Sequence, residues 1–188
     1  MKDLLLHTCC GPCATVAVPA WRARGHEPLA WFGNPNIQPA ADLERRLESM
    51  RRFSEAAELE LVVADVMHED AWRAWAAELD TLPAEERCRV CLGLRLDEAG
   101  AAAVRLGVER FATSLTVSPH QRHDLIAAAG EAAARRHGVA FLSLDLRDRF
   151  RDSYAESRRL DLYRQPYCGC AASKWEAWHE RRRRRRAG

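Results

Sequence analysis

Short apolar runs alternate with longer amphipathic segments along most of this 188-residue chain, and that alternation limits the possible fold more than any other feature. Strands that alternate with helices imply a parallel sheet covered by helices on both faces. The predicted strands span residues 4–7, 28–32, 60–64, 110–115 and 139–144. The predicted helices span residues 12–24, 43–57, 85–106 and 121–137, with a further helix around Trp72 and Trp75. The sequence therefore predicts an α/β protein with about five strands.

Composition and length fit one soluble domain. Hydrophobic residues make up 47% of the chain and charged residues 30%, which is typical of globular proteins. No uncharged apolar run reaches the 18 residues of a transmembrane helix. The apolar run after Lys2 is too short for a signal peptide. We expect a cytoplasmic protein with no membrane partner and a single domain over residues 1–180.

Six consecutive arginines, residues 181–186, stand near the C-terminus. Without them the net charge of +2 becomes −4, so the basic character of the chain is concentrated there. A run of like charges cannot pack, and residues 181–188 are predicted to form a disordered tail. Such a tail is either a solvated end or a tether that binds a polyanion with release of counterions.

Seven cysteines occur in three groups: Cys9, Cys10 and Cys13, then Cys88 and Cys91, then Cys168 and Cys170. Grouped thiols in a cytosolic protein bind metal or carry out redox chemistry more often than they form structural disulfides. Adjacent cysteines do not fit one tetrahedral zinc ion easily, but they can reach different irons of a cluster. The adjacent pair and the CxxC pair together supply four thiolates, the number that a [4Fe–4S] cluster needs. Buried apolar cysteines and structural zinc remain the alternatives.

The sequence around the second and third cysteine groups indicates how reactive their thiols are. Cys88 and Cys91 are expected near a helix start, where the helix dipole lowers a thiol pKa. The Cys168-Gly169-Cys170 segment is too tight for a relaxed disulfide in regular structure. These two thiols are therefore either a labile redox couple or, together with Cys13, ligands of a second metal.

Ligands of open parallel sheets bind beyond the carboxyl ends of the strands. The first cysteine group follows the first predicted strand, and the polar segment 113–120 follows the fourth. Two segments rich in reactive side chains at one end of the sheet mark the expected site.

Taken together, the motifs of this chain resemble those of a known family, the QueH epoxyqueuosine reductases. The resemblance covers residues 4 to about 175 in the expected order and rests on five segments. They are His7-Thr8-Cys9-Cys10-Gly11-Pro12-Cys13, Asn34-Pro35-Asn36-Ile37, Glu86-Arg87-Cys88-Arg89-Val90-Cys91 with Arg95-Leu96, Thr113-Ser114-Leu115-Thr116-Val117-Ser118-Pro119-His120, and Tyr163-Arg164-Gln165-Pro166-Tyr167-Cys168-Gly169-Cys170. The arginine run and the Trp175/Trp178 pair are not part of the family pattern.

The resemblance implies a Rossmann-like (HUP-type) sheet and reduction of the epoxide of epoxyqueuosine to queuosine in tRNA, the last step of queuosine biosynthesis. It implies a [4Fe–4S] cluster on Cys9, Cys10, Cys88 and Cys91, with a possible second iron ion nearby. Cys168 and Cys170 match the family's redox-active pair, and Cys13 matches a position suited to an iron ligand. The expected partners are tRNA carrying epoxyqueuosine and a low-potential electron donor such as ferredoxin or flavodoxin.

Further residues beside these motifs are candidates for the site. His120 and Tyr167 are candidate proton donors, and His7 is either a donor or a structural hydrogen-bond partner. The candidate substrate contacts are Asn34, Asn36, Ser118, Arg164 and Gln165.

Two other classes of function stay open. One is a zinc-stabilised RNA-binding module without catalysis, and the other is a nucleotide-activating tRNA sulfurtransferase. No Gly-rich phosphate loop follows the first strand, which argues against use of ATP.

Overall fold

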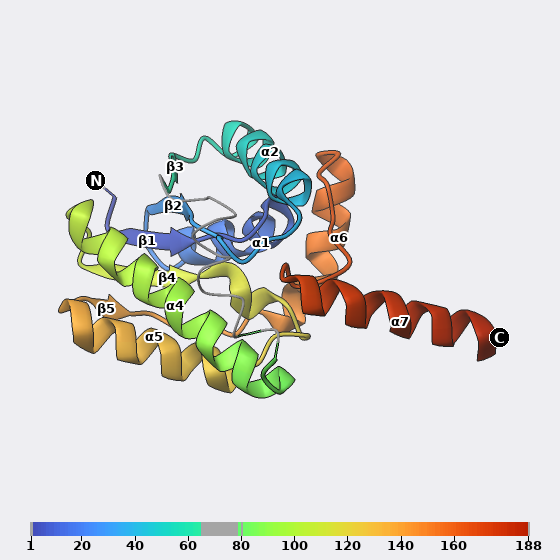
Figure 1. Ribbon diagram of the computed structural model, residues 1–188. Helices are drawn as coiled ribbons and strands as arrows, with labels where there is room; N and C mark the ends of the chain where they lie inside the picture. Colours follow the sequence, from blue (N-terminus) through green and yellow to red (C-terminus); the bar gives the residue numbers. More distant parts are fainter. Residues whose placement is uncertain (1, 65–78, 80, 188) are drawn as a thin grey trace.

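A computed structural model describes residues 2–64, 79 and 81–187 and contains a five-stranded parallel sheet in the order β3-β2-β1-β4-β5. Helices cover both faces of the sheet (Figure 1), so the α/β prediction is confirmed. The strands are β1 (Leu4–His7), β2 (Pro28–Phe32), β3 (Leu61–Val63), β4 (Arg110–Thr113) and β5 (Ala140–Phe141). The helices are α1 (Gly11–Arg22), α2 (Ala40–Ala56), α4 (Ala84–Arg105), α5 (His123–His137), α6 (Phe150–Arg159) and α7 (Ala171–Ala187). Two short 3-10 helices are η1 (Ser114–Val117) and η2 (Arg147–Arg149).

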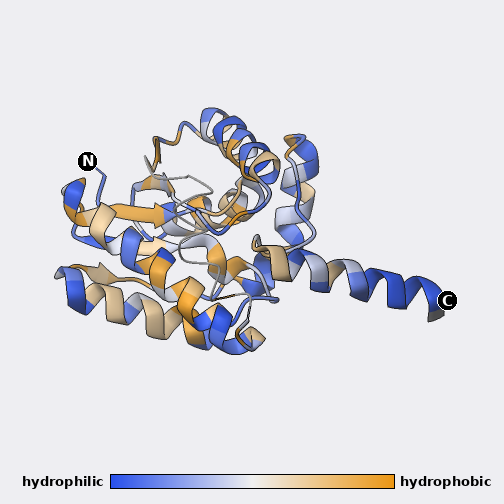
Figure 2. Cartoon of the chain, viewed as in Figure 1, coloured by the Kyte–Doolittle hydropathy of each residue, from blue (hydrophilic) through white to orange (hydrophobic). Residues whose placement is uncertain are grey.

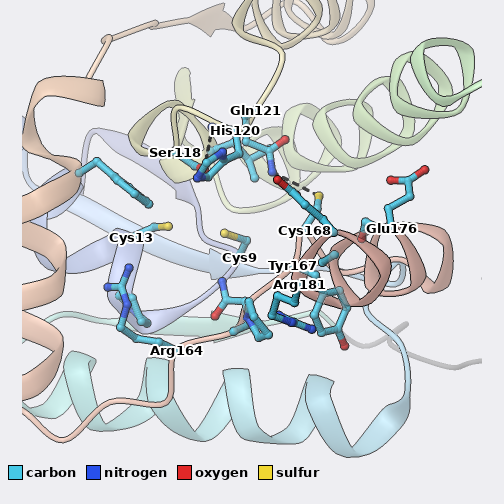
Figure 3. Close-up of a pocket in the computed structure, with 18 of the residues that line it drawn as sticks. Cys9, Cys13, Ser118, His120, Gln121, Arg164, Tyr167, Cys168, Glu176 and Arg181 are labelled. Carbon is cyan, nitrogen blue, oxygen red and sulfur yellow. Dashed lines mark hydrogen bonds between the residues drawn. The ribbon is translucent and has the colours of Figure 1, made fainter. Parts of the chain in front are cut away.

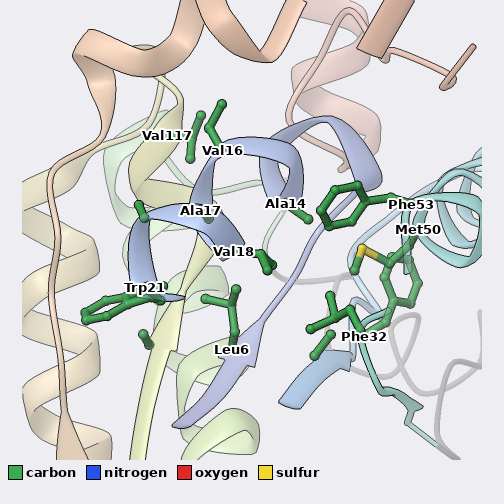
Figure 4. Close-up of a cluster of buried hydrophobic side chains, with 14 of the residues drawn as sticks. Leu6, Ala14, Val16, Ala17, Val18, Trp21, Phe32, Met50, Phe53 and Val117 are labelled. Atoms are coloured by element: carbon green, nitrogen blue, oxygen red, sulfur yellow. The ribbon is translucent and has the colours of Figure 1, made fainter. Parts of the chain in front are cut away.

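The central strand β1 divides its side chains between two cores, because successive residues of a strand point to opposite faces. Leu4 and Leu6 belong to the core under α1 and α2. Figure 4 shows Leu6 there with Trp21 and Met50. Leu5 belongs to the core under α4 and α5. All three leucines are fully buried, which is the pattern of a strand with helices on both faces.

The strand order has a consequence for ligand binding. The chain leaves β1 for β2 on one side, and the other neighbour of β1 is β4. Loops therefore diverge at the carboxyl ends of β1 and β4, the topological switch point at which open α/β sheets bind their ligands. The first cysteine group follows β1 and η1 follows β4, so the expected site lies at this point.

Several elements differ in extent from the sequence-based predictions. Residues 114–115 belong to η1 rather than to the fourth strand, and the fifth strand keeps only two residues. No helix was predicted after residue 137, where the structure contains η2, α6 and α7. The helix expected around Trp72 and Trp75 lies outside the described residues.

The largest difference concerns the arginine run. The tail predicted to be disordered instead continues helix α7 through Arg186, and Figure 1 shows this helix extending away from the body. Arginine is a good helix former, and Arg184 pairs with Glu180 one turn earlier. These local effects favour the helix even without a packed face. Figure 2 shows the hydrophilic character of its outer end.

None of the described helices combines the length and the apolar character that crossing a membrane requires.

Candidate metal centre and substrate cavity

Three thiols gather where β1 passes into α1. Cys9 and Cys10 follow the strand, and Cys13 lies in the first turn of the helix, whose start is favoured by Pro12. Their sulfur atoms all lie within 4.8 Å of one another, and the sulfurs of Cys9 and Cys10 are 3.7 Å apart. Cys9 and Cys10 are buried. This thiol triad offers soft donors at a spacing that suits a metal or a metal cluster.

The middle thiol of the triad, Cys10, is the most acidic of the three. Hydrogen bonds from Cys13 and Cys9 hold the pKa of Cys10 well below its usual range, despite its burial. The same hydrogen bonding to Cys10 raises the pKa of Cys9 to about 12, and it raises the pKa of Cys13 well above its usual value. The Gln165 amide also donates to Cys10 Sγ at 3.1 Å. Cys10 is therefore the thiol of the triad that loses its proton most readily, and a metal would bind the deprotonated sulfurs.

Two buried arginines lie in the electrostatic neighbourhood of the triad. Arg46 of α2 interacts with the charges of Cys10 and Cys9, and Arg95 of α4 interacts with Cys9 and Cys91. Burial would lower the pKa of Arg46, but the charges of Cys10 and Asp42 raise it above its ordinary value. Both guanidinium groups are thus placed to balance the negative charge of several thiolates.

The other four cysteines form a second electrostatic neighbourhood. Cys88 and Cys91 of α4 both interact with Cys168 and Cys170. Burial raises the pKa of Cys91 to about 12, and burial followed by the nearby thiols raises the pKa of Cys88. The expectation that a helix start would lower these values was wrong. Helix α4 begins at Ala84, so Cys88 lies in the second turn, and the dipole acts mainly within the first.

All seven cysteines are free thiols in the structure, and the second group differs from the triad in exposure. Cys168 is exposed, Cys170 and Cys88 are half-buried, and Cys91 is buried. The three-thiol group within 4.8 Å contains neither Cys88 nor Cys91. The four-cysteine ligand set expected from the sequence therefore combines one pair from each neighbourhood and stays a prediction.

A cavity of about 560 Å³ opens above the thiols. Figure 3 shows Cys9 and Cys13 on one side of it, with Cys168 opposite and Ser118 and His120 along the rim. Its lining includes eight of the expected site residues: Cys9, Cys13, Ser118, His120, Arg164, Gln165, Tyr167 and Cys168. The switch point of the sheet thus carries a substrate-sized hollow with thiols on its wall.

The candidate proton donors differ in whether their polar side-chain atoms can reach a substrate in the cavity. His120 faces the cavity at the rim, where its backbone N–H donates to Ser118 Oγ at 3.3 Å. The Tyr167 hydroxyl donates to the carbonyl of Gln38 at 2.5 Å, and burial and then the nearby Asp42 carboxylate raise its pKa. His7 is buried, with its Nδ1 2.8 Å from Thr113 Oγ1, and burial and the charge of Arg95 hold its pKa well below the usual value. His7 is therefore held inside the protein and is not part of the cavity lining.

Two expected substrate contacts turn their polar atoms to the protein. Arg164 Nη1 donates to the Ser153 carbonyl and to Ser157 Oγ, both at 2.9 Å, and its guanidinium lies 3.4 Å from the centre of the Tyr154 ring. Asn34 is fully buried: its amide donates to the Thr8 carbonyl, and its oxygen accepts from Arg95, each at 2.8 Å. Arg164 ties the segment before Cys168 to α6, and Asn34 ties the β2 loop to β1 and α4.

Some buried polar atoms lack partners in the described part of the chain. They include both polar side-chain atoms of Asn36, Nε and Nη1 of Arg95, and Oε1 of Gln165. An unpaired buried polar group is costly, so such atoms usually have a partner that belongs to the complete site. Together with the soft donors of the triad, they fit a bound metal group and a polar ligand beside it.

The sequence analysis assigned no role to two residues that the structure places at the site. Arg46 donates from Nη1 to the Cys168 carbonyl at 2.8 Å and from Nε to Asp42 at 2.7 Å. Gln121 donates to Cys168 Sγ at 3.2 Å. Arg95, noted only as part of a motif, stands beside Leu96 in the apolar stripe of its helix. A charged residue within an apolar stripe was the signal available for it, because a buried charge needs a nearby partner.

Comparison with known proteins supports one family. The family model for "Epoxyqueuosine reductase QueH" matches residues 4–176. The epoxyqueuosine reductase QueH of Dehalococcoides mccartyi is 38% identical over 174 residues, covering 92% of this chain and 93% of the relative. The protein of the same name from Thermotoga maritima is 29% identical over 181 residues, covering 94% and 92%.

A solved structure supports the fold alone. The predicted subunit of a tRNA methyltransferase from Methanocaldococcus jannaschii superimposes with a TM-score of 0.51 at 9% identity, covering 83% of this chain and 76% of that one. The sheet is thus Rossmann-like, as the resemblance implied. The family match, together with the thiol triad at the switch point, identifies the chain as a member of the epoxyqueuosine reductase QueH family.

Proposed function

We propose that this protein reduces the epoxide of epoxyqueuosine in tRNA to the alkene of queuosine. The observation that carries the proposal is the thiol triad at the switch point of the sheet, of which Cys9 and Cys13 line a cavity of about 560 Å³. The names of the relatives supply the substrate. Removal of the epoxide oxygen takes two electrons and two protons and releases water.

We propose Cys9, Cys10, Cys88 and Cys91 as the ligands of a [4Fe–4S] cluster. Thiolates are the usual ligands of such clusters, and bound there the cluster would supply electrons one at a time. The buried charges of Arg46 and Arg95 support the binding of several thiolates in one place.

Cys168 and Cys170 are proposed as the redox-active pair. Cys168 lines the cavity, accepts a hydrogen bond from Gln121, and is exposed enough to react. Oxidation of the two thiols to a disulfide releases two electrons and two protons, which balances the epoxide reduction. The alternative is that Cys168 and Cys170 join Cys13 as ligands of a second iron.

Among the candidate donors, His120 has the position suited to protonating the leaving oxygen, since its side chain faces the cavity. Tyr167 contributes its ring to the wall, while its hydroxyl is held by Gln38. Ser118, Gln165 and Asn36 are proposed substrate contacts. Arg164 and Asn34 are proposed to act on the substrate only through the segments that they hold in place. A ferredoxin or flavodoxin as electron donor and a cytoplasmic location remain predictions from the sequence.

The experiment is anaerobic purification followed by metal analysis and a turnover assay. We expect a brown protein with iron, sulfide and broad absorbance near ~400 nm, typical of thiolate-bound clusters. With a chemical reductant, it should convert epoxyqueuosine to queuosine in tRNA isolated from cells that lack the reductase. A colourless zinc protein without turnover would instead support the RNA-binding module, and ATP-dependent sulfur transfer would support the sulfurtransferase.

A further inference from the structure

Helix α7 carries an unusual concentration of positive charge next to the cavity. Arg181–Arg186, here called the arginine arm, follow one another within the helix. An α-helix turns 100° per residue, so the six side chains point to every side of its axis. The rest of the chain carries a net charge of −4, and the arm therefore supplies the excess of positive charge.

The base of α7 is fixed to the site. Buried Arg87, next to Cys88, donates to Glu176 of α7 at 2.6 Å. Ser173 Oγ donates to the Cys170 carbonyl at 2.9 Å. One stripe of the helix then lines the cavity, and it consists of Ser173, Glu176, Ala177, Glu180, Arg181 and Arg184. The position of the arm is thus set by contacts to the thiol segments, and the arm begins at the cavity mouth.

Most of the arm has no internal partner. Arg184 pairs with Glu180, and the Arg182 guanidinium lies 4.6 Å from the centre of the Trp178 ring. Within the described chain, Arg183, Arg185 and Arg186 form no ion pair, side-chain hydrogen bond or ring contact. Like charges one turn apart repel by a few tenths of a kcal/mol, and a bound polyanion would relieve that repulsion.

The inner part of the helix adds aromatic surface. Trp175 is 63% exposed and Trp178 44% exposed. Exposed aromatic rings close to cations are typical of proteins that bind single-stranded nucleic acid, where bases stack on the rings. A membrane is the poorer occupant, because the arm has no apolar face to insert below the headgroups.

We propose that the arginine arm binds the phosphate backbone of the RNA whose modified nucleoside enters the cavity. The inference rests on the proposed function for the identity of that RNA. The inference extends the proposed function by assigning substrate docking to a helix beside the reactive thiols. Arg181 and Arg184 line the cavity, so a strand that delivers one nucleoside to it comes within reach of the arm. The arm therefore lowers the KM for tRNA and takes no part in the chemical step.

The test compares two triple variants of the full chain. The arm variant carries Arg183→Gln, Arg185→Gln and Arg186→Gln, which lie outside the cavity lining, and glutamine keeps the helix propensity. The control carries Arg24→Gln, Arg51→Gln and Arg135→Gln, which removes the same charge from exposed positions elsewhere. Circular dichroism checks that helix content is kept. Affinity for a labelled tRNA transcript is measured by fluorescence anisotropy over a range of salt concentrations.

We expect the arm variant to bind more weakly at low salt. The log–log salt slope should flatten by about 0.7 to 0.9 for each phosphate that the variant no longer neutralises, or about 1 to 2 in total, because only part of the arm can face one strand. The control should keep the wild-type slope. In turnover assays the arm variant should show a raised KM for tRNA with an unchanged kcat.

An unchanged slope in the arm variant, or an equal loss in the control, would overturn the proposal. Stronger binding of the wild-type protein to anionic lipid vesicles than to tRNA at the same salt would overturn the assignment to RNA. The binding measurement does not depend on reduction. An arm-dependent slope in a protein that fails to reduce epoxyqueuosine would therefore support the arm while refuting the reductase proposal.

Discussion

Arg46 shows how much one buried residue does for this site. Its side chain is fully buried on α2, and it bonds to Asp42, to the Cys168 carbonyl and to the Tyr167 carbonyl at 3.3 Å. These bonds hold the segment with the third cysteine group against α2. Two features explain why residue 169 is a glycine. A Cβ at this position would lie 2.9 Å from Asn36 Nδ2, and other residues rarely adopt its φ of +153°.

Arg46→Met tests this contact. The variant leaves Asp42 without its buried cation and frees two carbonyls, so we expect the free energy of unfolding to fall by about 3–5 kcal/mol. Arg45→Met, at the exposed neighbouring position, should change it by less than about 0.5 kcal/mol. Urea unfolding of the anaerobically purified proteins measures both. Equal stabilities would show that the segment is held by other contacts.

Cysteine substitutions test the proposed ligand set. Cys9→Ala, Cys10→Ala, Cys88→Ala and Cys91→Ala should each lose cluster iron and sulfide, because each removes one proposed thiolate. Cys168→Ser and Cys170→Ser should keep the cluster and lose epoxide reduction, since serine is a poor soft-metal ligand and forms no disulfide. Iron and sulfide analysis with a turnover assay measures both effects.

The serine variants also separate the two roles of the third group. Loss of about one iron beyond the cluster would support ligation of a second iron, and unchanged iron would support a dithiol. Turnover at the wild-type rate in both serine variants would refute either role. Full iron and sulfide in Cys88→Ala and Cys91→Ala would remove that pair from the ligand set and leave the triad as the metal site.

At the scale of elements, the packing of α1 against α2 positions the triad. A Cβ on Gly11, the residue after Cys10, would lie 2.4 Å from the Ser49 carbonyl oxygen and 2.7 Å from Ser49 Oγ. Only glycine lets the start of α1 approach α2 this closely. The first turn of α1 carries Cys13, so a shift of this helix would move the sulfur atoms relative to one another.

Gly11→Ala should therefore lower the free energy of unfolding by about 1–3 kcal/mol through overpacking and should also reduce the iron bound per chain. Gly93→Ala is the matched control, because a Cβ there meets nothing within 4 Å inside helix α4. That variant should gain up to about 1 kcal/mol from helix propensity and keep its iron. Denaturation curves and iron analysis of the pair check both expectations, and full iron in Gly11→Ala would contradict the positioning role of α1.

At the scale of the whole molecule, a metal group on the proposed ligands would link parts of the chain that are far apart in sequence. Cys9 and Cys10 follow β1, while Cys88 and Cys91 belong to α4, which packs on one face of the sheet. A group that binds only the folded chain stabilises it by mass action. Each kcal/mol of that binding should raise the Tm by about 2–4 °C in a chain of this size.

Removal of iron by an anaerobic chelator should therefore lower the Tm by several degrees. The Cys9→Ala/Cys10→Ala double variant lacks two proposed ligands, so it should show no such shift. Differential scanning calorimetry of the four samples measures the effect. Equal Tm values for wild-type protein with and without iron would show that the metal group does not link these parts of the chain.

The order of strands and helices followed from local patterns, and so did the position of the first cysteine group. Strands β1 and β2 have the predicted bounds, because buried apolar runs and turn residues mark them in the chain itself. Helix α5 ends at His137, as predicted, because Gly138 after it accepts a φ of +68°. The extra length predicted for the fifth strand was wrong, because strand pairing depends on a neighbour that periodicity does not describe.

The sequence by itself determined the fold class, the three cysteine groups and the end of the sheet at which the site lies, because each follows from short-range pattern and strand topology. Only the tertiary structure decided that the sulfurs of Cys9, Cys10 and Cys13 converge within 4.8 Å and that Cys88 and Cys91 neighbour Cys168 and Cys170. It also placed the buried Arg46 and Arg95 near these thiols. It also decided that the arginine run is a helix anchored at the cavity. The physical reason is that burial, pKa and charge pairing depend on which distant segments come into contact, and a linear pattern does not contain that information.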